Sequence, residues 1–253
     1  MVEGVASKKR RGRPRKDGSK SINQRAEIAA AAIELFSRQG YAQTTLSSIA
    51  RAAGLDQSSV YYWFSGKDDI LRHLVELNRS SLTVASDIGS FPDDKPAQLY
   101  TVLHEDVLML CRLPFDFYVL EQAASAQPDN FADLAADYRA LVDQVCGIIE
   151  SGVADGSFVA CDAGREAVVA LAMDEGVQHR FHSKGVMSCV VTEGERSEGA
   201  SGAACENAKA GGLALEASEV ADAGASATVA RLLARETVAE VRARARERKW
   251  VTC

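Results

Sequence analysis

The stretch that decides the fold is residues 44–67, TTLSSIARAAGLDQSSVYYWFSGK. Apolar residues recur at spacings of three and four over residues 46–53, which predicts a short amphipathic helix. Gly54 stands where a helix commonly ends in left-handed backbone. A second short helix is predicted over residues 57–64, so the stretch forms two helices joined by a tight turn.

Three aromatic residues, Tyr61, Tyr62 and Trp63, lie between Val60 and Phe64 on the second predicted helix. Val60 and Phe64 are one turn apart and share the inner face of that helix. The three intervening rings cannot all face inward as well. At least one large aromatic side chain is therefore expected on the surface.

The glycine turn, the lengths of the two helices and the block VYYWFSGKDDIL at 60–71 closely resemble the TetR (tetracycline-repressor) family of dimeric bacterial transcription regulators. The resemblance is specific over residues 21–77 and weak beyond them. It implies an all-α chain with a three-helix helix-turn-helix DNA-binding domain over 21–66. A helical regulatory and dimerisation domain is expected over 67–253, with a flexible insertion near 190–212.

The resemblance also assigns DNA contacts. In a helix-turn-helix the second helix enters the major groove and its first residues meet base edges. Gln57, Ser58 and Ser59 are thus expected to contact bases. Phosphate contacts are implied for Thr45, Ser47, Ser48, Tyr61, Trp63 and Lys67. Trp63 stands where the family often has histidine, although its indole N–H can still donate to a phosphate. Tyr62 either contacts DNA or packs against the core or hinge.

The first twenty residues form a basic segment. They carry eight Lys or Arg against two acidic residues, a net +6, whereas the whole chain has a net charge of −6 and the remainder therefore −12. Within KRRGRPRK at 9–16, the core Arg11-Gly12-Arg13-Pro14 resembles an AT-hook, with Arg11, Arg13 and Arg15 in the minor groove. The alternative is a disordered basic tail over residues 1–20 that touches phosphates without specificity.

The regulatory domain of this family encloses a mostly apolar ligand pocket, which implies a hydrophobic small-molecule effector with few polar anchors. Each candidate lining residue is alternatively plain core. The candidates are Leu103, Met109, Phe115, Phe117, Tyr118, Tyr138 and Met173.

Two late helices are expected to form the dimer interface, one over residues 165–182 and one long helix over 225–249. One chain alone cannot cover both of their apolar faces. Arginines crowd the end of the last predicted helix. They either complement the helix dipole or form a second DNA site, and the dipole is the simpler account.

Other chemistries find little support in the sequence. The six cysteines contain no CxxC pair, and the usual interpretation is reduced thiols rather than a redox sensor. His179 and His182 are the only closely spaced histidines and lack a clear carboxylate partner. There is no phosphate loop and no GxSxG, so we expect no enzyme, no metal and no cofactor.

Taken together, the sequence predicts a cytoplasmic, nucleoid-associated bacterial homodimer that binds a palindromic operator as a repressor and is released by an effector. No stretch is long and apolar enough to span a membrane. The alternative, from another class, is a DNA-architectural or protein-recruiting module without an effector. An enclosed pocket in the second domain would favour the repressor, and a closed, dry core would favour the alternative.

Overall fold

The computed structural model describes residues 18–88, 93–183 and 216–251, with only the backbone of 18–23 and 80. The regular elements of this part are helices, and the predicted all-α class is confirmed. A single isolated bridge joins Phe158 to Leu233. The predicted arm at 1–20 falls almost wholly outside the described residues, as do Arg11, Arg13, Arg15 and the predicted insertion near 190–212.

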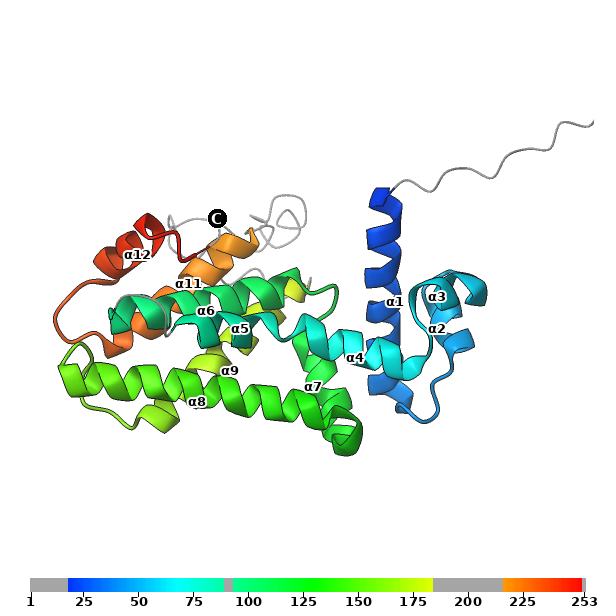
Figure 1. Cartoon of the computed structure of the whole chain (residues 1–253), viewed down its shortest axis with the longest axis horizontal. Coiled ribbons are helices and arrows are strands. Elements are labelled where there is room, and N and C mark those ends of the chain that lie inside the picture. The colour runs from blue at the N-terminus through cyan, green and yellow to red at the C-terminus, as the bar shows by residue number, and fades with distance from the viewer. Residues whose placement is uncertain (1–17, 89–92, 184–215, 252–253) are drawn as a thin grey trace, which may run out of the picture.

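Four helices stand at one end of the molecule (Figure 1). Three form a compact group with the fourth leading away from it: α1 Gly18–Gln39, α2 Leu46–Ala52, α3 Gln57–Trp63 and α4 Lys67–Leu77. Gly54 has a φ of 66° and adopts the left-handed backbone expected at the end of α2, and Gly40 after α1 does the same with a φ of 86°. The N–H of Leu55 then donates to the carbonyl of Ala50 at 2.8 Å and closes the turn.

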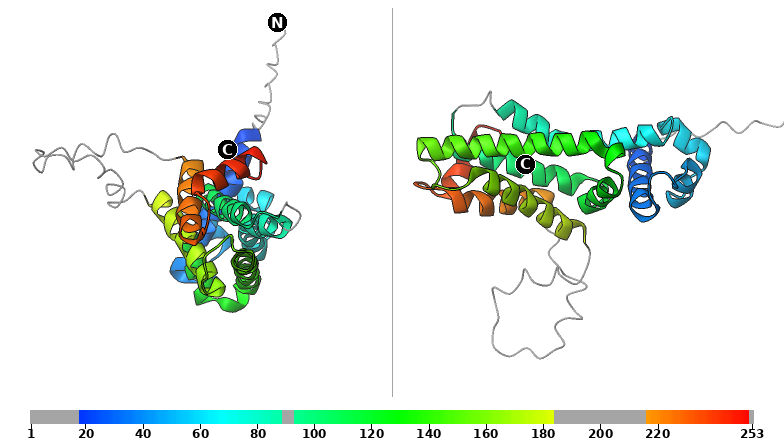
Figure 2. Two further views of the ribbon diagram at one scale, coloured as in Figure 1. Left: turned by 90° about the vertical axis from the view of Figure 1, so that its left-hand side faces the viewer. Right: turned by 90° about the horizontal axis from the view of Figure 1, so that it is seen from below.

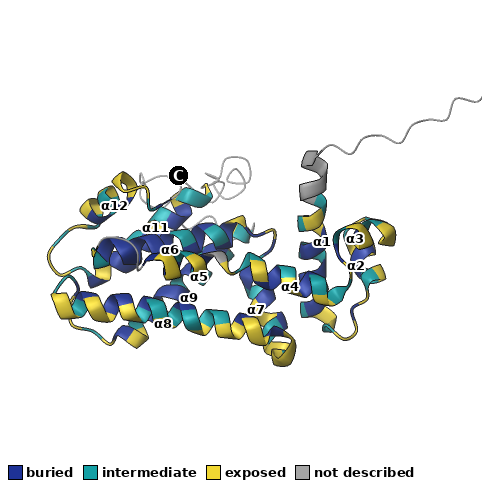
Figure 3. Ribbon diagram, in the orientation of Figure 1, coloured by how far each residue is buried: buried dark blue, intermediate teal, exposed yellow. Residues whose placement is uncertain are grey.

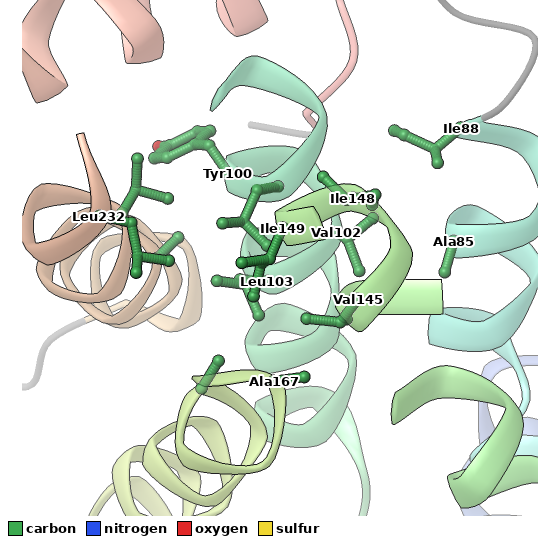
Figure 4. Close-up of a cluster of buried hydrophobic side chains, with 14 of the residues drawn as sticks. Ala85, Ile88, Tyr100, Val102, Leu103, Val145, Ile148, Ile149, Ala167 and Leu232 are labelled. Atoms are coloured by element: carbon green, nitrogen blue, oxygen red, sulfur yellow. The ribbon is translucent and has the colours of Figure 1, made fainter. Parts of the chain in front are cut away.

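The remaining helices form a larger bundle in which α6 is central (Figures 1 and 2). They are α5 Ser80–Asp87, α6 Lys95–Arg112, α7 Phe117–Ala126, the 3₁₀ turn Pro128–Phe131, α8 Ala132–Asp155, α9 Ala163–His182, α11 Ala217–Leu232 and α12 Val238–Glu247. Buried apolar residues of α5, α6, α8, α9 and α11 meet in one cluster, where Leu103 and Tyr100 of α6 lie opposite Ile149 of α8 and Leu232 of α11 (Figure 4).

Helix α6 begins directly after residue 94, because Asp94 accepts a hydrogen bond from the N–H of Ala97 and Pro96 fits the first turn. The prediction was wrong for one late helix. The single helix expected over 225–249 is two helices, α11 and α12. The chain leaves α11 at Leu233, where Ala234 donates to the carbonyl of Ser157 at 3.0 Å, and this tertiary pairing breaks the helix.

The second core cluster joins the two ends of the molecule. It contains the interior of α1–α4, including Phe36 and Phe64, and continues into Leu110 of α6 and Leu120 of α7. Two hydrogen bonds add to this contact: Ser37 donates to Gln122, and the N–H of Tyr41 donates to Gln127 at 2.7 Å. Helices α1–α4 are therefore packed directly against the larger bundle.

Candidate nucleic-acid interface and effector region

The two short helices α2 and α3 are held by local bonds. Thr45 and Ser48 form a capping box, in which each hydroxyl accepts from the other residue's N–H, at 3.1 and 3.0 Å. Asp56 occupies the N-cap of α3 as expected, but its side chain makes no capping hydrogen bond. Val60 and Phe64 are buried and fix the inner face of α3.

The opposite face of α3 is exposed (Figure 3). Gln57 and Ser58 are exposed, and Ser59 is half-buried. Tyr61 and Tyr62 are 55% and 70% exposed, the largest values among the big apolar side chains of the described residues. Two neighbouring rings that are exposed to water are typical of a surface that contacts a binding partner. The helix thus offers amide, hydroxyl and phenol groups on one continuous surface.

The first turn of α2 adds hydroxyls to this end of the molecule. Thr45 and Ser47 are exposed and Ser48 is half-buried. Ser48 uses its hydroxyl proton on the carbonyl of Thr45 at 2.7 Å, whereas the hydroxyl of Thr45 acts as an acceptor and keeps its proton. Of this pair, Thr45 is therefore the residue whose hydroxyl can donate to a phosphate.

Two of the expected phosphate contacts are engaged within the chain. The ammonium of Lys67 donates to the carbonyl of Tyr41 at 2.7 Å and lies 4.4 Å from the centre of the Tyr41 ring. The indole Nε1 of Trp63 is covered and has no hydrogen-bond partner in the described part of the chain. The Trp63 N–H is thus covered in the described structure, and Lys67 ties the loop between α1 and α2 to the start of α4, so both phosphate contacts stay predictions.

Two acidic residues that follow Lys67 make hydrogen bonds to neighbouring segments. Tyr41 donates from its hydroxyl to Asp68, and burial together with that carboxylate raises the pKa of Tyr41 well above its usual range. One residue further on, Asp69 accepts from the N–H of Ser65 at 3.0 Å, and this bond lowers the pKa of Asp69. These acidic first-turn residues anchor the start of α4.

The seven expected ligand-lining residues are not gathered in one cavity. Leu103 is fully buried in the regulatory core, whereas Met109, Phe115 and Phe117 belong to the cluster shared with α1–α4. Tyr138 packs against the same cluster as Leu103, and each of the last three residues has a partner on α9 or α11. Tyr118 stacks against His179, Tyr138 bonds Glu175, and Met173 accepts from the hydroxyl of Thr228 at 3.7 Å.

A groove of about 610 Å³ lies elsewhere, between α5, α6 and α8. Its lining mixes polar side chains such as Ser86, Gln98 and Gln144 with the apolar side chains of Ile88 and Ile148. The hydrophobic pocket thus stays a prediction.

Sequence reasoning missed a group of interior carboxyls on α6 and α9, namely Asp106, Asp174 and Glu175. Asp106 and Asp174 are 5% and 0% exposed. A signal for them existed in the sequence. Asp106 falls between Leu103 and Leu110 on the apolar stripe of α6, and Asp174 falls one turn after Ala170 on that of α9.

The arginines near the C-terminus have acidic partners that were also not expected. Arg244 binds both oxygens of Asp94, at 2.8 and 3.1 Å, and Arg248 binds the same carboxylate at 2.7 Å. Arg242 pairs with Asp222 of α11 at 2.8 Å. These arginines fasten α12 to the start of α6 and to α11.

The cysteines and the two closely spaced histidines are placed as follows in the described part of the chain. Cys111, Cys146 and Cys161 are free thiols, and the other three cysteines lie outside the described residues. His179 contacts Asp116, and His182 lies 3.1 Å from the carbonyl of Leu110. Among the described residues no helix is long and apolar enough to cross a membrane, and no cluster of His, Cys, Asp and Glu has the arrangement of a metal site.

The part of the chain that matches a known family model is the helix-turn-helix region. Residues 28–74 match the family model described as bacterial regulatory proteins, tetR family. The chain is 35% identical over 126 residues to the HTH-type transcriptional regulator HbdR of Aromatoleum sp. (strain CIB), covering 47% of this chain and 49% of HbdR. It is 29% identical over 153 residues to the HTH-type transcriptional repressor KstR2 of Rhodococcus jostii (strain RHA1), covering 57% and 72%.

The whole bundle resembles solved structures as well. The crystal structure of Mycobacterium smegmatis AmtR superposes with a TM-score of 0.60 at 20% identity, covering 90% of this chain and 95% of AmtR. That identity is too low to carry more than the fold. The chain spans about half or less of the length of four of the curated relatives it matches.

Proposed function

We propose that this chain is a DNA-binding transcription regulator of the TetR family, a repressor that a small molecule releases from its operator. The match of residues 28–74 to the family model and the similarity to HbdR support the proposal. The observation that carries the proposal is the exposed face of α3. Its first turn offers Gln57 and Ser58, and its next turn offers Tyr61 and Tyr62, while Val60 on the other face is buried. Polar groups at the front of a short, firmly seated helix are what base recognition in the major groove needs.

The proposed contacts divide into two kinds. Gln57, Ser58 and Ser59 contact base edges, and the amide of Gln57 is able to make two hydrogen bonds to one adenine. The hydroxyls of Thr45, Ser47 and Tyr61 bind phosphates on either side and set the register of the helix. The arm with Arg11, Arg13 and Arg15 adds affinity in the adjacent minor groove.

The proposal includes a homodimer on a palindromic operator. Val168 and Val169 of α9 are 50% and 36% exposed, and exposed alanines 223, 227 and 230 follow one face of α11. Small and β-branched residues allow two helices from each chain to approach closely in a four-helix interface. Since α12 is a separate helix clamped by arginines, α11 takes the place that the long last helix was expected to have. Two chains then present α3 to successive major-groove faces, ~34–36 Å apart.

The alternative without an effector is favoured by one observation, the tight packing around Leu103. The interior carboxyls of α6 and α9 argue against it. A core that only had to be stable would gain free energy from apolar residues at Asp106 and Asp174. We therefore retain the effector, and with it a regulator that acts in the bacterial cytoplasm.

Binding of the purified full chain to DNA from beside its own gene tests the proposal. Gln57→Ala should weaken binding about tenfold, because one bidentate base contact contributes ~1–3 kcal/mol. Tyr61→Phe removes only an exposed hydroxyl and should weaken binding by about 1 kcal/mol, the net free energy of one hydrogen bond. Fluorescence anisotropy at fixed salt measures both, and the mass of the complex should correspond to two chains per operator.

A matched control is Asp143→Asn, at an exposed position on α8, a helix of the larger bundle. Its affinity should equal that of the unmodified chain. If Gln57→Ala and Tyr61→Phe also leave the affinity unchanged, then α3 does not read the operator.

A further inference from the structure

Three carboxyl groups lie inside the regulatory bundle, where α6 and α9 cross. Asp174 of α9 is fully buried, and both of its carboxylate oxygens are covered and without a hydrogen-bond partner among the described residues. Asp106 of α6 is 5% exposed, and Glu175, next to Asp174, is half-buried. A buried oxygen without a donor costs several kcal/mol relative to its hydrated state, so natural cores rarely keep one.

The electrostatic surroundings of this acidic cluster are one-sided. The charged side chains that act on the three carboxyls in the described part of the chain are each other and Glu121 of α7. Burial raises the pKa of Asp106 to about 6 and that of Glu175 to about 7, and burial with the neighbouring carboxyls raises the pKa of Asp174 well above its usual range. Without a ligand the cluster therefore holds protons in place of a counter-charge.

The remaining neighbours are uncharged, and they include the buried thiol of Cys111 on α6, whose pKa is raised by burial and by the nearby Asp106 and Asp174. Tyr138 of α8 bonds Glu175, and Ser81 of α5 lies beside Asp106. On α11 the chain has a glycine, Gly224. A Cβ there would lie 3.8 Å from Oδ1 of Asp174 and 3.5 Å from a methyl group of Val107, which are ordinary contact distances, so the glycine leaves room for about one methyl group beside the carboxylate.

We propose that this acidic cluster binds the ammonium group of an organic amine, whose apolar body lies among Val107, Val177 and Met173. A primary ammonium has three N–H donors and a full positive charge, which match two unpartnered oxygens of Asp174 and one more carboxylate. The valine and methionine side chains suit an alkyl or aryl body and do not suit a hydrated ion. The site lies beside Tyr138 and Met173, two of the seven residues expected to line a pocket.

The position of the cluster explains how an amine would act on DNA binding, and this step rests on the proposed function. One turn beyond Glu175, the side chain of Gln178 donates to Asp116 at 3.0 Å, and His179 contacts the same carboxylate. Asp116 is the N-cap of α7, and α7 packs on α1 through the bond from Ser37 to Gln122. A shift of α9 on binding is thus passed through α7 to the helix that supports α2 and α3.

Titration of the full chain with octylammonium chloride tests the inference, with octanol and octanoate as neutral and anionic compounds of the same length. Calorimetry should show saturable binding of octylammonium at least about tenfold tighter than that of octanol, and no binding of octanoate. At pH 6 the apparent enthalpy should depend on the ionisation enthalpy of the buffer, because the entering cation displaces protons from the cluster.

Asp174→Asn keeps the size of the side chain and removes its charge, so it should lose about tenfold or more in octylammonium affinity. Glu175→Gln, at a half-buried position, provides a second variant if the first does not fold by circular dichroism. Asp143→Asn should bind octylammonium as the unmodified chain does. Equal affinities for octylammonium and octanol, or an unchanged affinity in a folded Asp174→Asn or Glu175→Gln protein, would overturn the inference.

The two proposals fail separately. Operator binding is measured first on the amine-free protein, so its absence contradicts the DNA-binding function alone, and calorimetry still reads the amine site. If the operator is bound but octylammonium is not, only the amine site is wrong. If both bind, octylammonium should weaken operator binding in the unmodified chain and not in Asp174→Asn.

Discussion

Asp106 lies on the buried stripe of α6 with a carboxyl group that is almost out of contact with water. Burial is the main cause of its raised pKa, and the hydroxyl of Ser81 offsets it only in part. The folded chain therefore holds a proton on Asp106 at a pH where the unfolded chain has lost it. Asp106 therefore contributes to a dependence of the free energy of unfolding on pH.

The sign of that dependence follows from the shift. The pKa of Asp106 is about 6 in the folded chain against 3.8 ordinarily, so its favourable contribution is complete below about pH 4 and lost as the pH rises through 6. At ~1.4 kcal/mol per pKa unit, the loss is on the order of 3 kcal/mol. Asp174 and Glu175 face the same region and contribute in the same direction.

We predict that Asp106→Asn, which cannot titrate, reduces the fall in unfolding free energy between pH 4.5 and pH 7.5 by about 2 kcal/mol. Urea denaturation at the two pH values measures the difference. Asp143→Asn on the surface of α8 should keep the full fall. An identical fall in Asp106→Asn and the unmodified chain would contradict the assigned environment.

At the scale of elements, α8 contains two glycines with opposite surroundings. Gly147 is exposed, with nothing within 4 Å of where its Cβ would lie. Gly152 is buried, and a Cβ there would lie 2.2 Å from the ring of Phe158. Phe158 follows the end of α8 and packs back on it, because its N–H donates to the carbonyl of Gly152 at 2.9 Å.

We predict that Gly152→Ala destabilises the chain by about 1–3 kcal/mol, because the Phe158 ring must move out of a packed core. Gly147→Ala, in the same helix, should stabilise the chain by about 0.5–1 kcal/mol, since alanine loses less backbone entropy on forming a helix. Thermal unfolding of the two variants measures both effects. A Gly152→Ala protein as stable as the Gly147→Ala protein would show that the ring does not contact this glycine.

At the scale of the whole molecule, charge is divided between a basic arm and an acidic body. Residues 1–17 of the arm precede the part that the structure describes, and their charges are known from the sequence. The body is strongly acidic overall, so phosphate affinity has to come from local groups on α2 and α3 and from the arm.

We predict that deletion of residues 1–17 weakens operator binding and lowers the slope of log K against log salt, by ~0.9 for each phosphate contact that is lost. Titrations between 50 and 200 mM salt, an interval typical for such binding, give the slope. Replacement of Arg11, Arg13 and Arg15 by glutamine in the full chain is the matched comparison. An unchanged slope after deletion would remove the arm from DNA binding.

The whole molecule also links its two ends through one core. Phe36 and Phe64 share a cluster with Leu110, Leu120 and Phe131, so the interior of the DNA-binding helices continues past the predicted boundary at 66/67. This packing gives a physical route between an interior ligand and α3, because α7 cannot shift without moving against α1.

Much of this architecture was determined by the sequence alone. The helix-turn-helix could be predicted because its signals are local: helical spacing of apolar residues, Gly54 in left-handed backbone, and a row of rings on α3 too long to be buried. The exposure of Gln57 and Tyr61 follows from the same pattern, since helical periodicity decides which face a residue takes.

Only the tertiary structure decided the features that depend on partners distant in the chain. The break between α11 and α12 comes from pairing with residues 157–159, and the C-terminal arginines are held by Asp94, 150 residues away. Trp63 and Lys67 are likewise engaged by packing that no local signal records. The meeting of Asp106 with Asp174 belongs to this class as well, because a helix pattern shows which face is buried but not which other face it meets.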